Sequence, residues 1–521
     1  MSSPSFATLA DLPAELYASI LDHVPISSLQ YTTAALLHAV PRAPIPLHYL
    51  YTCVRLRSPK KVVLFYQHLL KYKDVVSLVR MFSLETWEAD AEIVVNLMEL
   101  FPQDTLREIV LFIGPKNFAP EHLQEIFRKP RYNLLFLSLR FRPYVQTASY
   151  YSFHKGAYFD STIFALSTWD SHLPYLSVVQ DPLDPSIAPS NFAQPIVFFR
   201  LDPLSHLSTS ELGTHLRHFR LRVPDRSIAR YITDRPGSLM HIECLDLSTC
   251  RVNETEAVAI LGRFAKLTHL LLDGPACSIV SHRTDMTEEE RRNAWAALGK
   301  VLALSGVRLA KEREKKIKAY LERIHAPPEE DEHRPIQTRE RRPRRGRRGL
   351  ATATISLRES PPTETNPLPP LTDEATSLAE LRQKLPKRVR VLPPQPFLSS
   401  LCVSVPGSHR TDVARQADSE LIRAEFERGW AEGLALLTTI RARLMQTWPS
   451  SSSGPDSDEE GTLSRSEEGL DGMVVVEFEE TFLVREDKCP VLCLAGGSSK
   501  DLDHAEGCGH RFDWEYWQNE L

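Results

Sequence analysis

The chain has 521 residues, too many for one compact core, and this length predicts about three to four domains. Its hydrophobic content of 42% and charged content of 25% are typical of globular proteins, and its net charge of -5 argues against general attraction to nucleic acid or membranes. Eight scattered cysteines suggest no disulfide framework. Because no signal-peptide pattern and no apolar run of about 18 residues occurs, we expect a cytoplasmic or nuclear protein without a membrane partner.

The first segment with a clear pattern is a pair of short amphipathic helices. Leu12, Leu16 and Ile20 recur at the spacing of one helix face, and Pro25 ends that helix. A second helix follows and would bury Leu29. A helix pair this short cannot cover its own apolar side chains, so we expect it to pack on another surface.

A leucine–proline start, an amphipathic helix, a turn and a second helix resemble the F-box, which docks on the adaptor of cullin-RING ubiquitin ligases. The resemblance implies a Skp-type adaptor and a cullin ligase as partners. It departs from the F-box pattern at residues 40–50, where three prolines replace the usual ending. In the alternative interpretation, the helices of residues 1–60 cap the domain behind them. The matching positions, expected to bind the adaptor, are Leu12, Pro13, Leu16, Ile20, Leu21 and Leu29.

Residues 61–282 contain an internal repeat of the form apolar-x-x-apolar-x-apolar. The first three copies start 27 and 28 residues apart and the last three 26 and 25 apart, whereas the central spacings of 39 and 43 indicate insertions. These periods are those of leucine-rich repeats, in which each unit is a strand and a returning helix. We therefore predict an α/β fold with a leucine-rich-repeat-type solenoid; an unrelated α/β domain is the alternative. The copies begin at Val79, Leu106, Leu134, Leu173, Leu216, Ile242 and Leu267.

The repeat also predicts the direction of individual side chains. Leu245 and Leu270 should point into the core shared by neighbouring units, while Glu243 and Asp246 should point outward, where they would contact a target protein. An F-box followed by such repeats resembles the expanded F-box families of mushroom-forming fungi. That resemblance implies a protein substrate, whose identity the sequence does not give.

Beyond the repeats the composition changes several times. Residues 283–325 predict one helix that closes the open end of the repeats, because a terminal unit must hide its apolar flank. Residues 326–376 are rich in Pro, Glu and Arg and are typical of a disordered linker. Residues 410–448 predict a long helix that packs on the repeats or on a partner, and residues 449–472 form an acidic, Ser-rich tract expected to be disordered.

The linker contains seven arginines in ten positions between residues 339 and 348. Such a cluster predicts a nuclear import signal or an electrostatic contact with an acidic partner, and a solvated charge run is the alternative. No aromatic residues interleave with the arginines, which argues against sequence-specific nucleic-acid binding. The import candidates are Arg341, Arg342, Arg344, Arg345, Arg347 and Arg348.

Residues 473–521 predict a small β-hairpin followed by cysteines and histidines. Cys489, Cys493, Cys508 and His510 are the residue types that tetrahedral zinc binds, and His504 lies nearby. Only one residue separates Cys508 from His510, which would strain a site formed by one turn. We therefore expect free thiols and no cofactor, with structural zinc as the alternative.

Motifs for nucleotide binding, metalloprotease chemistry and serine hydrolysis are absent from the sequence, and only 21 residues are glycine. The sequence therefore predicts a protein that binds and does not catalyse. With the F-box resemblance, it predicts the substrate-recognition subunit of a cullin-RING ubiquitin ligase. The alternative is a non-catalytic interaction scaffold with no ligase association.

Overall fold

A computed structural model describes most of the repeat region and parts of the C-terminal half. Its contacts divide the chain into one unit of Met1–Leu309, Pro393–Arg443 and Phe478–Leu521 and a second of Ala310–Leu392 and Leu444–Glu477. None of the helices in the described part of the chain is long and apolar enough to span a membrane. The described residues are 9–114, 117–142, 157–181, 200–235, 237–274, 277, 287–325, 388–404, 412–446, 473–476, 488–495 and 504–511.

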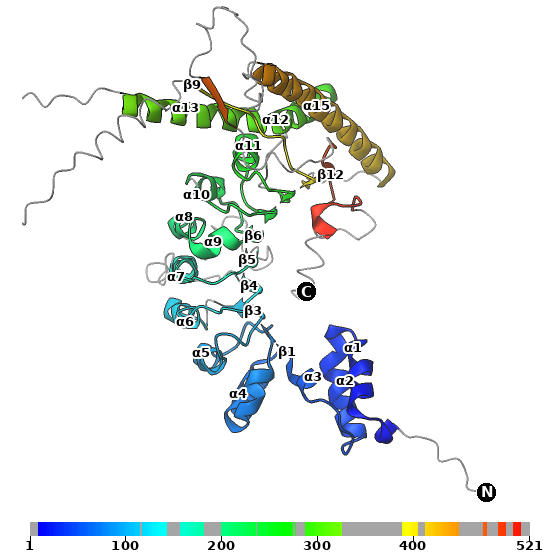
Figure 1. The fold of residues 1–521 in the computed structure, drawn as a ribbon. Coiled ribbons are helices and arrows are strands. Elements are labelled where there is room, and N and C mark those ends of the chain that lie inside the picture. Colours follow the sequence, from blue (N-terminus) through cyan, green and yellow to red (C-terminus); the bar gives the residue numbers. More distant parts are fainter. Residues whose placement is uncertain are drawn as a thin grey trace, which may run out of the picture. The chain divides into compact units, whose positions relative to one another are not determined.

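A parallel sheet of ten strands runs through the first unit (Figure 1). The first eight strands lie side by side in sequence order, and two strands from distant parts of the chain extend the sheet beyond them. This confirms the predicted α/β class. The strands, in sheet order, are β1 (Cys53–Leu56), β2 (Met81–Leu84), β3 (Glu108–Ile113), β4 (Phe136–Phe141), β5 (Tyr175–Gln180), β6 (His218–Arg222), β7 (Cys244–Asp246), β8 (His269–Leu271), β10 (Ser400–Cys402) and β12 (Val491–Cys493).

Helices connect successive strands and cover one face of this sheet (Figure 1). Several begin where a polar side chain accepts hydrogen bonds from the first backbone N–H groups, as Ser58, Asp90 and Asn253 do. The 3-10 helix η2 (Lys73–Leu78) precedes β2. The helices are α4 (Pro59–Lys71), α5 (Ala91–Leu100), α6 (Pro120–Ile126), α7 (Ala157–Ser167), α8 (Asp202–Leu207), α9 (Glu211–His215), α10 (Ala229–Thr233) and α11 (Glu254–Arg263).

The repeat pattern in the sequence marks the core between the strands and these helices. All three apolar positions in each of the seven copies are buried, and each copy overlaps or leads into one of the strands β2 to β8. Leu245 and Leu270 are fully buried, as predicted. They also pair directly across β7 and β8. The pattern did not identify β1, β10 or β12, which are short strands at the two ends of the sheet.

Two helices, not one, follow the repeats. The predicted single helix breaks at Leu304 into α12 (Glu288–Ala303) and α13 (Ser305–His325). The long predicted helix is α15 (Asp412–Gln446), and it packs back on α12, burying Phe426 and Trp430 in the main core. The crossing is close because Gly429 lies against the backbone of Ala296, where an added Cβ would meet the carbonyl oxygen at 1.8 Å.

The C-terminal strands differ from the predicted hairpin. Met473–Val476, named β11, pairs in parallel with β9 (Arg388–Val391) in a separate two-stranded sheet, and β12 joins the ten-stranded sheet. In the second unit, Arg390 of β9 forms an ion pair with Glu314 at 2.9 Å. The predicted linker of residues 326–376, its arginine cluster at 339–348 and the acidic tract of residues 449–472 lie outside the described residues.

Candidate functional site

The three N-terminal helices form a small core of their own. In α1 (Ala14–Asp22), Tyr17 and Leu21 are fully buried, and they pack with Ile45, which precedes α3 (His48–Tyr51). The prolines of residues 41–46 lie between α2 (Ile26–Ala39) and α3, so the third helix begins only after the last of them. Helices α2 and α3 contact β1, which is the first strand of the sheet.

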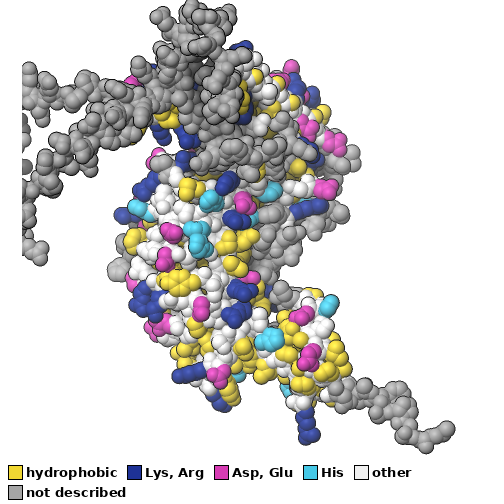
Figure 2. All heavy atoms as spheres, viewed as in Figure 1, with side chains coloured by type: hydrophobic (Ala, Val, Ile, Leu, Met, Phe, Trp, Pro, Cys, Tyr) yellow, Lys and Arg dark blue, Asp and Glu magenta, His cyan; other side chains and the backbone are white. Residues whose placement is uncertain are grey.

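The six positions expected to bind an adaptor fall into different environments. Leu16 and Ile20 lie four residues apart on α1 and are 48% and 45% exposed. Pro13 is exposed as well, whereas Leu12 and Leu29 are half-buried against the small core. Leu21 is fully buried, so its side chain packs the core. Figure 2 shows hydrophobic side chains gathered on the surface of this N-terminal region.

The face of the sheet opposite the helices carries charged side chains in ion pairs. Asp246 points to this face, as predicted from its position beside Leu245, but the expectation that it is exposed was wrong because its relative exposure is 1%. Its carboxylate accepts from Arg220 Nε at 3.0 Å, from Arg222 Nη2 at 2.6 Å and from the Ser248 backbone N–H at 2.8 Å. Burial alone would raise the pKa of Asp246, but the guanidinium groups of Arg222 and Arg220 hold it well below its ordinary range.

Aromatic and arginine side chains meet near the carboxyl ends of β2, β3 and β4. The rings of Trp87 and Phe112 stack with centroids 4.8 Å apart. The guanidinium of Arg140 lies 5.4 Å from the Phe112 ring, and that of Arg142 lies 5.8 Å from the Trp87 ring. Arg140 also pairs with Asp181 at 2.8 Å, while Arg142 is exposed. We call Trp87, Phe112, Arg140 and Arg142 the arginine–aromatic cluster.

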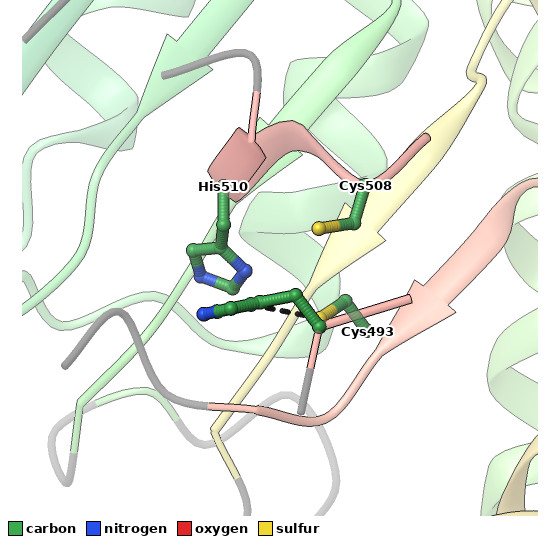
Figure 3. Close-up of side chains that lie close together, drawn as sticks. Cys493, Cys508 and His510 are labelled. Carbon is green, nitrogen blue, oxygen red and sulfur yellow. Dashed lines mark hydrogen bonds between the residues drawn. The ribbon is translucent and has the colours of Figure 1, made fainter. Parts of the chain in front are cut away.

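A second cluster consists of two cysteines and two histidines near the end of β12. One donor atom from each of Cys493, His504, Cys508 and His510 lies within 4.8 Å of every other, and all four residues are buried. Cys493 Sγ and His504 Nδ1 are 3.7 Å apart. The thiols of Cys493 and Cys508 and the ring of His510 point toward one another (Figure 3). We call these four residues the Cys/His cluster.

The sheet and one tight turn position the Cys/His cluster. Cys493 ends β12, where it pairs with Cys402 of β10 on the face opposite the helices. Residues 505–508 then form a turn in which Gly507 has a φ of +74°, a conformation that favours glycine. One helical turn follows at residues 509–511 and brings both Cys508 and His510 to the cluster. A single intervening residue therefore does not prevent Cys508 and His510 from lying in the same cluster.

The carboxylate of Asp273 holds His510 in place. Its Nε2 lies 2.5 Å from Oδ2 of Asp273, which follows β8 and whose backbone N–H donates to Ser248 Oγ. Burial would lower the pKa of His510, but the Asp273 carboxylate, together with hydrogen bonding to Cys493 and Cys508, outweighs this effect and raises the pKa to about 12. The other ring nitrogen, Nδ1, is buried and has no nitrogen or oxygen partner.

The sulfur atoms of this region have different protonation preferences. Hydrogen bonds from Cys402 and Cys508 lower the pKa of Cys493 far below its ordinary value, which favours the thiolate form. Burial and hydrogen bonding to Cys493 raise the pKa of Cys402 well above its ordinary value, so Cys402 stays a thiol. A buried thiolate beside imidazole nitrogens is a donor set suited to a soft or borderline metal ion.

The structure changes the membership of the predicted metal candidates. Cys489 does not belong to the cluster; it packs partly buried against the main core, and burial raises its pKa to about 12. His504 takes its place. The spacing of three residues between His504 and Cys508, like that between Cys489 and Cys493, is compatible with metal binding, so the sequence alone could not choose between them.

Comparisons with known proteins provide no family assignment. No protein-family model matches the chain, and a search of curated proteins finds no match.

Proposed function

We propose that this protein is the substrate-recognition subunit of a cullin-RING ubiquitin ligase. In this proposal the N-terminal helices are an F-box that binds a Skp-type adaptor, and the strand–helix units are a leucine-rich-repeat-type solenoid that binds a protein target. The protein itself binds and does not catalyse.

The observation that carries the proposal is the exposure of Leu16 and Ile20 on α1. Both are large apolar side chains on one helix face, while the neighbouring Tyr17 and Leu21 supply the core that keeps α1 folded. Leu16 and Ile20 are therefore not needed for the small core. Grouped apolar side chains that remain exposed mark surfaces at which proteins bind each other.

Target binding is assigned to the face of the sheet opposite the helices, at the arginine–aromatic cluster. Arginine and tryptophan are enriched among the residues that contribute most to protein–protein binding. Arg142 is exposed above the half-buried Trp87 ring, which keeps the guanidinium accessible and partly ordered. An acidic or aromatic segment of the target would complement this pair.

The adaptor proposal is tested by co-purification of the tagged full chain from cells with its adaptor. Leu16→Asp should abolish adaptor recovery, because a charge at this position would be desolvated on docking. Leu64→Asp is the matched control, since Leu64 is 53% exposed but lies on α4. Equal adaptor recovery with wild type and Leu16→Asp would contradict the proposal. Failure of wild type to recover any adaptor would leave the interaction scaffold as the function.

Target binding is tested separately with Arg142→Glu in the same experiment. This variant should lose the proteins that co-purify with wild type while retaining the adaptor, because Arg142 lies on the opposite face from the helices and far along the chain from α1. Arg128→Glu on the helix side is the matched control, with an exposed arginine that pairs with Glu125 at 3.0 Å. Loss of the same proteins with Arg128→Glu would place target binding elsewhere.

A further inference from the structure

We propose that Cys493, His504, Cys508 and His510 bind one zinc ion in a closed structural site. The inference is independent of ligase function, because it concerns only how the C-terminal segment is attached to the sheet. It rests on the distances among the four donors, on the buried Nδ1 of His510 and on the Asp273 carboxylate that contacts Nε2 of the same ring.

The distances fit a tetrahedral ion. Zinc lies about 2.3 Å from cysteine sulfur and about 2.0–2.1 Å from histidine nitrogen, so tetrahedral S and N ligands are separated by about 3.5 Å. Cys493 Sγ and His504 Nδ1 are 3.7 Å apart, and all four donor atoms lie within 4.8 Å of one another. The Cys493–His504 separation already matches this value, and the widest donor separations would shorten by about 1 Å as the ion binds.

The two nitrogens of His510 already have the roles expected of a zinc ligand. Nε2 faces the Asp273 carboxylate at 2.5 Å, while Nδ1 is buried without a nitrogen or oxygen partner in a residue that is only 7% exposed. A buried polar atom without a partner is unfavourable, and a metal ion would satisfy it. Histidines that bind zinc commonly donate their other N–H to a carboxylate, which fixes the ring orientation.

The charges also balance. On binding, the cysteines coordinate as thiolates and the histidines as neutral imidazoles, and the protons that they lose pass to solvent. Two thiolates neutralise the charge of Zn²⁺, which suits a buried site. With four protein ligands the ion has no open position, so the site is structural and not catalytic.

The site would attach residues 504–510 to the sheet. Cys493 belongs to β12, the other three ligands come from residues 504–510, and Asp273 follows β8. Gly509 lies against Leu271 and Ser400, where an added Cβ would be 3.0 and 3.2 Å from their side chains. The ligand turn is therefore packed on the sheet, and the ion would hold it to β12.

The test uses the purified full chain, reconstituted with zinc and then exhaustively dialysed, with metal content measured by mass spectrometry. Wild type should retain about one equivalent of zinc, and Cys493→Ser should lose it, because a closed site needs all four ligands. Cys489→Ser is the matched control and should retain zinc, since Cys489 lies outside the cluster. Replacement of zinc by cobalt should give the intense visible absorption bands of tetrahedral cobalt. Sulfur-to-cobalt charge transfer should add bands at shorter wavelength.

Wild type that is folded by circular dichroism but retains no zinc would overturn the proposal, as would equal retention by Cys493→Ser. Loss of zinc from Cys489→Ser but not from Cys493→Ser would also overturn it. If Cys493→Ser is insoluble, thiol alkylation of wild type provides the answer. Zinc should protect Cys493 and Cys508 from alkylation, and a chelator should remove that protection; identical labelling with and without the chelator would refute the site.

Discussion

The two ends of the ten-stranded sheet are covered in different ways. Beside β1, the helices α1 to α3 are continuous in sequence and share a small apolar core of Tyr17, Leu21 and Ile45. Beyond β8, the covering segments come from distant parts of the chain and meet at cysteines, histidines and the carboxylate of Asp273. Apolar side chains pack at both ends, because Leu401 and Leu492 lie in the main core, and the second end adds a buried cluster of cysteines, histidines and the Asp273 carboxylate.

This difference follows from how each segment reaches the sheet. A contiguous helical segment loses little entropy on packing, so three buried side chains suffice and other apolar residues such as Leu16 remain available for a partner. A segment that closes a long loop must offset a larger entropic cost with few residues. Metal coordination concentrates a large, directional free energy in four side chains, which suits the second end.

Removing zinc should give the largest effect and should separate the two ends. Structural zinc contributes about 10–16 kcal/mol in small zinc-finger peptides, and even a fraction of that would dominate the stability of β12. A chelator should therefore increase hydrogen exchange in β10 and β12 and leave α1 unchanged, because repeat units couple mainly to their neighbours. Equal exchange with and without the chelator would show that β10 and β12 are held in the sheet without a contribution from zinc.

Asp246→Ala should be the most destabilising single change between the two ends. It leaves Arg220 and Arg222 without the buried carboxylate that both contact, and breaking such a buried pair costs about 3–5 kcal/mol. Urea unfolding of the full chain should show this loss. Glu243→Ala serves as the control because its carboxylate is 41% exposed and 3.9 Å from Arg217, so its loss should cost less than about 1 kcal/mol.

Leu21→Ala should loosen the first end alone. Truncating a fully buried leucine costs about 2–5 kcal/mol, and here the loss should appear as faster hydrogen exchange in α1 and α2. Leu16→Ala, one turn away on the exposed face, should change stability by about 0.5 kcal/mol or less. If Leu16→Ala destabilised α1 as much as Leu21→Ala, Leu16 would be a core residue and not a free docking residue.

An effect similar in size to that of Leu21→Ala, but confined to acidic pH, is a pH dependence from His218 in β6. Burial, followed by the charges of His269 and Arg217, lowers the pKa of His218 from 6.5 to about 4. The unfolded chain therefore binds this proton at a higher pH than the folded chain, so stability is complete above about pH 6.5 and falls as the pH drops toward 4. The loss should approach about 3 kcal/mol.

The variant His218→Gln isolates this effect. The difference between the wild-type and variant unfolding free energies should change between pH 6.5 and 4, whereas other titrating groups cancel in the comparison. Asp246 contributes mainly below this range, because the unfolded chain protonates this carboxyl only near its ordinary pKa while the folded chain keeps it ionised. If this difference in unfolding free energy stayed constant across the range, His218 would have the same pKa in the folded and unfolded chains.

Much of the sheet was predictable because its core residues follow a local rule. The spacing that begins at Leu216, Ile242 and Leu267 repeats the same backbone path, so each apolar position occupies the same place in successive units. Helix α5 (Ala91–Leu100) lies between β2 and β3, where the repeat predicts a returning helix. The prediction of Asp246 as exposed was wrong because alternation gives direction, whereas burial depends on the arginines of the neighbouring strand.

The candidate zinc site was only partly predictable. Short spacings such as that between Cys508 and His510 indicate metal-binding chemistry, but they do not reveal which distant residues come together. Asp273 carries no sequence signal that connects it to His510, since their contact arises from the joining of β10 and β12 to β8. Short strands such as Ser400–Cys402 have too few residues for a periodic pattern to identify them.

The late arrival of β10 and β12 has a consequence for synthesis on the ribosome. His269 and Ser400, hydrogen-bonded across β8 and β10, are 131 positions apart, and Asp273 and His510 are 237 apart. Because chains fold from the N-terminus as they emerge, β8 presents an unpaired hydrogen-bonding edge while all the intervening residues are translated. A product truncated before β10 would keep that edge open and expose it to chaperones and proteases. Pairing of β10 with β8 is therefore the step that removes this open edge.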